Sequence, residues 1–330
     1  MTPLLDVRQL TVTLPGRDAD TALVRGIDLR LNAGETVALV GESGSGKSLT
    51  VMAMMGLLPT GLRTGGSIEF DGTDLTSLSE SAMRGIRGRD IAMVYQDPMT
   101  SLNPYHRIGA QIAEGMTAHG VSPADARQRT LELLDRVGIP DPVRTTRAYP
   151  HEFSGGMRQR VMIAMALAMR PRLLFADEPT TALDVTIQQQ ILALVAELRT
   201  ELGMATVWVT HDLGVVARLV DRVLVMYAGR IVEDAPVRQI FAAPQHPYTA
   251  QLLASLPNPT DDERGDLAQI PGRPPDPADL PTGCSFRPRC PQAREICAAE
   301  PALQPRGGGV AACHVPPAHW RPSDVVVAGC

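Results

Sequence analysis

The order of hydrophobic and polar residues along the chain predicts strands that alternate with helices. In the first 35 residues apolar and polar positions alternate around a turn near residues 15–20, which predicts an antiparallel pair of strands. Apolar runs at 36–40, 172–176 and 205–210 predict buried strands, and a segment of helical composition follows each of them. This order predicts an α/β fold with a mainly parallel core and with its chemistry at the carboxyl ends of the strands.

The middle of the chain has a different pattern. Between about residues 98 and 162 strand signals are absent, and helical periodicity at 108–118 and 124–137 predicts a helical subdomain inserted in the sheet. Around it we expect strands at 67–75, 90–96, 223–227 and 230–233, a turn or short helix at 77–88, and helices at 157–169, 186–200 and 249–255.

Composition narrows the class of protein. The 330 residues are 44% hydrophobic and carry a net charge of −5, which suits a folded core and disfavours a nucleic-acid binder held by a basic face. The longest apolar run, Val161–Met169, has nine residues, so we expect no membrane span. The N-terminus lacks the pattern of a secretory signal, and we expect the chain to stay in the cytoplasm.

A glycine-rich stretch follows the apolar run at 36–40. Its composition is typical of a phosphate-binding loop, in which backbone N–H groups converge at the start of a helix. Lys47 can reach the β and γ phosphates, and the Ser48 hydroxyl can bind Mg²⁺. A glycine-rich linker beside a helix is the alternative. The residues that we expect to bind nucleotide here are Gly41, Glu42, Ser43, Gly44, Ser45, Gly46, Lys47 and Ser48.

Two carboxylates, Asp177 and Glu178, follow the apolar run at 172–176. Such a pair at the end of a buried strand needs a cation or a water molecule nearby. Asp177 is the candidate for the Mg²⁺ shell. Glu178, pointing to the other side as the next residue of a strand does, could polarise the water that attacks the γ phosphate. An ordinary acidic turn is the alternative.

Polar residues also close two other strands. His211 follows the run at 205–210, where it could sense the γ phosphate and hold the attacking water, or could serve as a structural hydrogen-bonding residue. Gln96 closes the run at 90–96, where its amide could contact metal or water, or could be an ordinary surface residue.

Ser154-Gly155-Gly156, followed by Met157, stands before a long predicted helix and offers a second anion site at a helix N-terminus. Because one nucleotide rarely needs two such sites, we expect this segment to bind the γ phosphate held by another subunit. Two chains would then close head to tail around two nucleotides. A plain serine cap is the alternative.

The C-terminal part is rich in proline and arginine and holds all five cysteines. Cys284, Cys290, Cys297 and Cys313 have the spacing C-x5-C-x6-C-x15-C, which suggests a metal or iron–sulfur site. The spacing lacks the C-x2-C knuckles of a standard zinc finger, although zinc or an empty site stays possible. Cys330 is expected to be a free thiol.

Together these motifs resemble an ATP-binding-cassette (ABC) ATPase. The resemblance is carried by GESGSGKS at 41–48, Gln96, FSGGM at 153–157, LLFADE at 173–178, Ala182-Leu183-Asp184 and His211. It implies that the phosphate loop binds ATP and that Ser48, Gln96 and Asp177 support Mg²⁺. It also implies that Glu178 is the general base, that Lys47, Gln96 and His211 assist hydrolysis, and that residues 182–184 lie at the dimer contact. Two departures are visible, since no aromatic residue precedes Phe70 to stack on adenine, and Met157 replaces the commoner glutamine.

YQDPMTSLNP, HEFSGGMRQR, THDLGVV and HPYTAQLL look like the oligopeptide/dipeptide importer subgroup. This resemblance implies an ABC ATPase domain at 1–235 and an importer-type extension at 236–330, whose four cysteines match a [4Fe-4S] set. It implies that the chain energises peptide import and binds no nucleic acid. The implied partners are a second ATPase subunit, two membrane permease subunits and an extracytoplasmic solute-binding protein. The implied location is the cytoplasmic face of the inner membrane. Nickel or another small solute is the alternative cargo. A soluble ABC ATPase of DNA repair or translation is disfavoured, because Gln96 and Ser154 are only 58 positions apart, which leaves no room for a long coiled coil.

Overall fold

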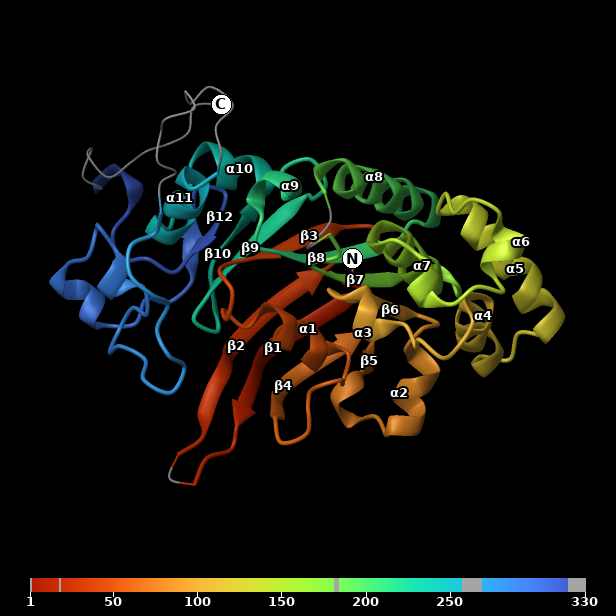
Figure 1. The fold of residues 1–330 in the computed structure, drawn as a ribbon. Coiled ribbons are helices and arrows are strands. Elements are labelled where there is room, and N and C mark those ends of the chain that lie inside the picture. Colours follow the sequence, from red (N-terminus) through yellow and green to blue (C-terminus); the bar gives the residue numbers. More distant parts are fainter. Residues whose placement is uncertain (1, 18, 181–183, 257–268, 320–330) are drawn as a thin grey trace. The chain divides into compact units, whose positions relative to one another are not determined.

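The computed structural model describes residues 2–17, 19–180, 184–256 and 269–319 of the chain (Figure 1). The chain forms two compact units that are each built from separate segments. The first unit combines residues 1–4, 31–35 and 73–208, and the second combines residues 5–30, 36–72 and 209–330. Residues 41–48 belong to the second unit, and Gln96, Ser154 and Glu178 belong to the first.

Parallel strands and their helices form the first unit. β6 (Ile91–Val94) pairs in parallel with β7 (Leu173–Asp177), and Met93 lies opposite Phe175. β8 (Ala205–Thr210) follows β7 in the sheet. The remaining elements of this unit are β5 (Thr73–Asp74), η1 (Leu75–Ser77), α2 (Glu80–Ile86), α3 (Pro98–Ser101), α4 (Ile108–Ala118), α5 (Pro123–Arg136), α6 (Pro142–Thr145), η2 (Pro150–Glu152), α7 (Gly155–Leu167) and α8 (Val185–Leu202).

The predicted helical subdomain is present in this unit as α4 to α7. α4 occupies the predicted range 108–118, and it buries Ile108, Ile112 and Met116, which recur every four residues on one face. α5 begins after the N-cap Ser122, whose Oγ accepts the N–H of Asp125 at 3.1 Å. The apolar period and the cap therefore account for both helices.

The second unit contains two groups of strands. β1 (Leu5–Leu14) lies between β2 (Thr21–Leu31) and β4 (Arg63–Phe70) in an N-terminal sheet, and it pairs antiparallel with β4. The other group has the order β11-β12-β10-β9-β3, in which β3 and β9 are parallel. Its strands are β3 (Thr36–Val40), β9 (Arg222–Tyr227), β10 (Arg230–Pro236), β11 (Gln304–Arg306) and β12 (Gly309–Ala311).

Helices of the second unit are short. They are α1 (Lys47–Met54), α9 (Leu213–Val216), α10 (Val237–Ala242), α11 (Pro247–Ala254), η3 (Arg287–Arg289), η4 (Glu295–Ala298) and η5 (Pro317–His319). An aromatic cluster joins the C-terminal extension to β9, because the rings of Tyr248 and Phe286 lie 4.6 Å and 5.2 Å from the ring of Tyr227. Tyr248 and Phe286 are almost fully buried. The extension therefore shares a core with the strand beside the phosphate loop.

Two predicted strands are shorter than expected, and the loop-rich extension contributes β11 and β12. The strand predicted at 67–75 ends at Phe70, because Asp71 and Gly72 both have positive φ and turn the chain. The strand predicted at 90–96 ends at Val94, so Gln96 lies in the segment that follows it.

Candidate functional site

A glycine-rich loop joins β3 to α1, as the sequence predicts. Gly46 occupies the N-cap of α1, and the first N–H groups of a helix have no partner within it. The Lys47 side chain is buried, and its Nζ donates to the carbonyl oxygens of Gly41 at 2.8 Å and Glu42 at 3.0 Å. The loop thus gathers a cation and backbone donors, which is the arrangement that binds an anion.

Two features of the loop fit a polyphosphate. Gly41 approaches the neighbouring strand so closely that a Cβ there would lie 2.2 Å from the carbonyl oxygen of Met226. Ser45 Oγ is buried and has no hydrogen-bond partner among the described residues. A buried hydroxyl without a partner costs about 1–3 kcal/mol, which a phosphate oxygen would offset. Ser48 follows on α1, half-buried, where its hydroxyl could serve Mg²⁺.

The structure brings Glu178 and Gln96 together in the first unit. Asp177 is the buried last residue of β7. Glu178 has a φ of 42°, in the left-handed region, so the prediction that it continues the strand is wrong. Its Oε2 accepts the Nε2–H of Gln96 at 3.0 Å. A carboxylate beside an amide at the carboxyl end of a buried strand can orient a water molecule.

Ser154 is the N-cap of α7, which begins two residues earlier than the sequence predicts. Its Oγ accepts the N–H of Met157 at 3.4 Å, and Ser154 and Gly155 are exposed. The helix N-terminus predicted at Ser154-Gly155-Gly156 is therefore confirmed, while its binding of a partner's nucleotide stays a prediction. Asp184 caps α8 through an acceptor bond from Ile187 N–H at 2.9 Å, whereas Ala182 and Leu183 lie outside the described residues.

His211 lies in the turn between β8 and α9. The turn is held by Asp212, whose N–H donates to Thr210 Oγ1 at 3.0 Å and whose Oδ1 accepts the N–H of Gly214 at 2.8 Å. The His211 side chain is exposed. This placement at a strand end agrees with the prediction, and the role of the imidazole in hydrolysis stays a prediction.

Tyr248 and Arg289 of the C-terminal extension contact the phosphate loop, and no pattern in the sequence predicts a role for either of them. Tyr248 Oη accepts the N–H of Glu42 at 2.8 Å, and Arg289 pairs with the Glu42 carboxylate at 2.6 Å and 3.0 Å. Tyr248 lies within HPYTAQLL, a stretch that indicates the importer subgroup without predicting a contact for the tyrosine. No local pattern links Arg289 to a loop residue 247 positions away.

The four clustered cysteines line one cavity of the extension together with Phe286 and Val315. All four are free thiols, and burial together with the neighbouring thiols raises the pKa of Cys290 to about 12. Among the residues that the structure describes, no group of three or more His, Cys, Asp and Glu side chains is arranged to hold a metal ion. The predicted metal site is therefore not confirmed, and Cys330 lies outside the described residues.

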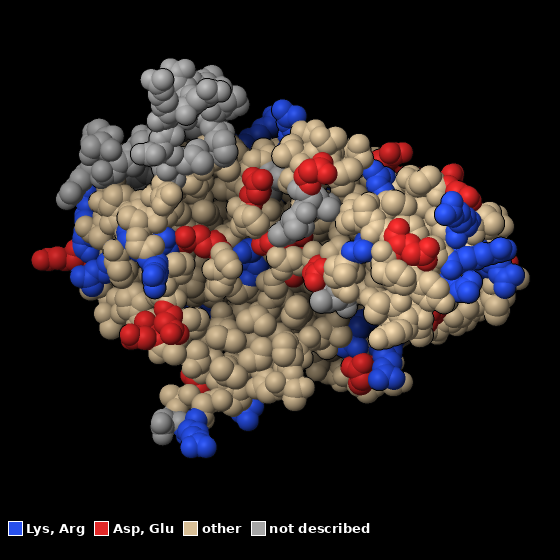
Figure 2. All heavy atoms as spheres, viewed as in Figure 1, with Lys and Arg blue, Asp and Glu red and all other residues tan. Residues whose placement is uncertain are grey.

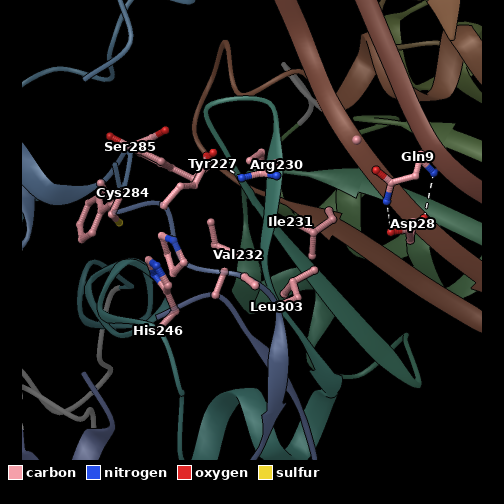
Figure 3. Close-up of a pocket in the computed structure, with 16 residues that line it drawn as sticks. Gln9, Asp28, Tyr227, Arg230, Ile231, Val232, His246, Cys284, Ser285 and Leu303 are labelled. Carbon is pink, nitrogen blue, oxygen red and sulfur yellow. Dashed lines mark hydrogen bonds and ion pairs between the residues drawn. The ribbon is translucent and has the colours of Figure 1, made fainter. Parts of the chain in front are cut away.

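A larger cavity of about 210 Å³ lies in the second unit, and none of residues 41–48 lines it (Figure 3). One wall comes from β1 and β2, where Gln9 donates to Asp28, and the other comes from β9, β10 and the extension. Arg25 and Arg230 share the carboxylate of Glu300 at 2.8 Å and 2.5 Å. The polar groups beside this cavity thus bond mainly to one another.

Two further features of the molecule are the distribution of charge on its surface and the length and polarity of its helices. Figure 2 shows acidic and basic side chains interspersed on the viewed face, without one continuous basic surface among the residues drawn in colour. No helix within the described residues is long and apolar enough to cross a membrane.

Two family models match parts of the chain. A family model for "ABC transporter" matches residues 24–181, and a model for "Oligopeptide/dipeptide transporter, C-terminal region" matches residues 232–297. The oligopeptide transport ATP-binding protein OppD of Salmonella typhimurium is 50% identical over 315 residues, which cover 95% of this chain and 94% of that protein. OppD of Bacillus subtilis is 50% identical over 299 residues, which cover 90% and 84%.

Solved structures with the same fold include two ATP-binding cassettes. The dimeric post-hydrolysis state of the cassette MJ0796 bound to ADP and Pi superposes with a TM-score of 0.63 at 28% identity, covering 71% of this chain and 99% of that chain. CbiO1 from Clostridium perfringens, part of the transporter complex cbiONQ, also has a TM-score of 0.63, at 29% identity, covering 74% and 92%.

Proposed function

Because the chain belongs to the ATP-binding proteins of ABC transporters, and is an ATPase of that family, we propose that it hydrolyses Mg-ATP to energise the import of peptides. The observation that carries the proposal is the phosphate loop with buried Lys47 in a chain that also has the OppD-type C-terminal region. Residues 1–235 would form the ATPase part and residues 236–330 the importer-type extension.

The phosphate loop performs the binding step. Backbone N–H groups at the start of α1 and the Ser45 hydroxyl would donate to the phosphate oxygens. Lys47 would exchange its bonds to two loop carbonyls for the β and γ phosphates. Ser48, Asp177 and Gln96 would hold Mg²⁺, which supplies charge neutralisation to the transferred phosphoryl group when bound.

Glu178 and Gln96 would prepare the attacking water. The Glu178 carboxylate accepts the water proton as general base, and the Gln96 amide, which donates to Glu178 Oε2, restricts its orientation. The left-handed backbone of Glu178 costs about 1–3 kcal/mol, a strain that is typical of functional positions. His211 would contact the γ phosphate from the turn after β8.

A second copy or paralogue would complete the site. Ser154 and Gly155 are exposed at the N-terminus of α7, and Gly156 and Met157 follow them, so backbone N–H groups there could bind an anion. We propose that this helix N-terminus binds the γ phosphate held by the other subunit, with residues 182–184 at the contact. ATP would close the two subunits, and hydrolysis would reopen them.

Peptides are the proposed cargo because the relatives named oligopeptide transport ATP-binding protein OppD match 90–95% of this chain. The proposed partners are a second ATPase subunit, two membrane permease subunits and an extracytoplasmic solute-binding protein, with the chain peripheral at the cytoplasmic face of the inner membrane. Uptake of labelled oligopeptides by cells with and without the gene tests the cargo. Loss of nickel uptake with unchanged peptide uptake would favour the alternative cargo.

We also propose that the four cysteines hold a [4Fe-4S] cluster, which would staple the loop-rich extension. Four thiols facing one cavity support a thiolate-bound group. Iron and acid-labile sulfide in protein purified without oxygen, lost in Cys290→Ser, would support the cluster. Zinc as the sole metal would contradict it.

The hydrolysis proposal is tested with Glu178→Gln. The amide keeps an oxygen that can accept from Gln96 Nε2–H but cannot take a proton, so we expect kcat for phosphate release to fall at least about 100-fold while Mg-ATP binding remains. Glu197→Gln, at an exposed position of α8, is the matched control and should keep the wild-type rate. Equal rates in both variants and the wild type would refute the assigned role of Glu178.

A further inference from the structure

Glu42 places a carboxylate inside the loop proposed to bind a triphosphate. Coulomb repulsion between unit charges about 4 Å apart is on the order of 4 kcal/mol at an effective dielectric constant of about 20, and it decreases with distance. A negative side chain in this loop therefore weakens phosphate binding unless a cation neutralises it. The side chain of Glu42 is 26% exposed, so solvent screens it only in part.

Arg289 supplies that cation from the C-terminal extension. Its Nη1 and Nη2 donate to the two oxygens of Glu42 at 2.6 Å and 3.0 Å, which is a bidentate pair. The Arg289 side chain is only 4% exposed. The bond to Glu42 raises the pKa of Arg289, so the neutralising charge is present at every working pH.

Other contacts hold Arg289 in place. Its Nε donates to the carbonyl oxygen of Pro271 at 2.9 Å, and its Nη2 also reaches that of Ile270 at 3.3 Å. Its guanidinium lies over the ring of Tyr227, 5.9 Å from the centroid. These contacts hold the guanidinium in place independently of Glu42, and the Glu42 carboxylate pairs with a cation whose position is already fixed.

The backbone of Glu42 is held by the same extension. Its N–H donates to the buried Tyr248 Oη at 2.8 Å. Prolines 274, 275 and 277 of the extension line a small pocket with Glu42, Ser43 and Gly44. The extension thus contacts this end of the phosphate loop through charge, a hydrogen bond and packing.

We propose that Arg289 is a positioning residue for ATP: it neutralises the Glu42 carboxylate and fixes its orientation, so the affinity of the phosphate loop depends on the C-terminal extension. The inference rests on the proposed function only in taking Mg-ATP as the ligand. It assigns the extension a role at the nucleotide site in addition to any role at its thiols.

The test measures Mg-ATP binding to the full chain by calorimetry, with Glu178→Gln in every protein to prevent turnover. Arg289→Met keeps the apolar stem and removes the charge, so we expect Kd to rise roughly tenfold. Arg289→Lys keeps the charge without the bidentate geometry and should bind within about threefold of the parent. Arg287→Met, an exposed arginine on the same short helix η3, is the matched control and should bind like the parent.

The second variant separates charge from structure. Adding Glu42→Gln to Arg289→Met removes the unpaired carboxylate, so we expect Kd to return to within about twofold of the parent. Equal weakening in the single and double variants would make Arg289 merely structural and overturn the inference, as would parental affinity in Arg289→Met. If that variant does not fold, Arg289→Gln replaces it with the same expected outcomes. Absence of binding in the parent would instead refute the proposed function.

Discussion

Gly41→Ala tests the close contact between the phosphate loop and β9. The added Cβ would lie 2.2 Å from Met226 O and 2.9 Å from Ser45 Oγ, and the first of these is backbone that cannot rotate away. Overpacking of this kind costs about 3 kcal/mol or more when strand backbone must shift. At roughly 2–4 °C for each kcal/mol, we expect the melting temperature without nucleotide to fall by about 6–12 °C.

Gly44→Ala in the same loop is the control. Gly44 has a φ of +79°, and a Cβ there would meet nothing within 4 Å, so the substitution adds only left-handed strain of about 1–2 kcal/mol. We expect the melting temperature to fall by about 2–8 °C in differential scanning calorimetry. If Gly41→Ala melted at or above the temperature of Gly44→Ala, the close approach of the loop to β9 would be refuted.

The remaining predictions concern the extension and α8. Phe286→Ala should cost about 3–5 kcal/mol because the ring is almost fully buried, and limited proteolysis should then cleave the extension first; an unchanged digestion pattern would contradict this. Burial lowers the pKa of His246 to about 3 in the folded chain. Between about pH 3 and pH 6.5 the imidazole is therefore protonated in the unfolded chain but not in the folded one. The free energy of unfolding should fall by up to about 1.4 kcal/mol for each pH unit as the pH decreases through this range. His246→Asn keeps an acceptor for Tyr248 N–H, and its unfolding free energy from urea titrations should lack this pH dependence. Equal pH dependence in the variant and the wild type would exclude the role of His246. Burial raises the pKa of Glu233, which changes stability with pH in the opposite sense in both proteins. Asp184→Ala should destabilise α8 by about 1 kcal/mol in chemical denaturation and Asp184→Ser by less, and equal losses would argue against the N-cap bond.

Local patterns in the sequence predicted most of the elements that position the site. β3 and β8 occupy the predicted ranges, because continuous apolar runs between polar ends leave little choice of register. A helix follows the glycine-rich loop as predicted, and Ser154 caps α7, although α7 begins two residues earlier than predicted. These features depend on neighbours within a few residues, which is why one sequence suffices for them.

Features that depend on distant residues were not predictable in this way. The left-handed Glu178 arises after β7 has ended, and the alternation of a strand carries no signal for it. The pair of Glu42 with Arg289 joins two segments with no shared motif. The cavity lined by the four cysteines was predicted in part. The spacing of the cysteines predicted that they would gather, but it did not predict how closely their sulfur atoms would approach.

The antiparallel pairing of β12 with β10 has a practical consequence. Glu233 and Asp234 face Ala311 and Val310 across this ladder, so residues beyond 300 shield the outer side of β10. A fragment cut after residue 235 would present uncovered amide and carbonyl groups along that strand, and such margins recruit strands from other molecules. We therefore expect the ATPase part without the extension to self-associate more readily than the full chain, because Glu233 and Asp234 lose their pairing with β12.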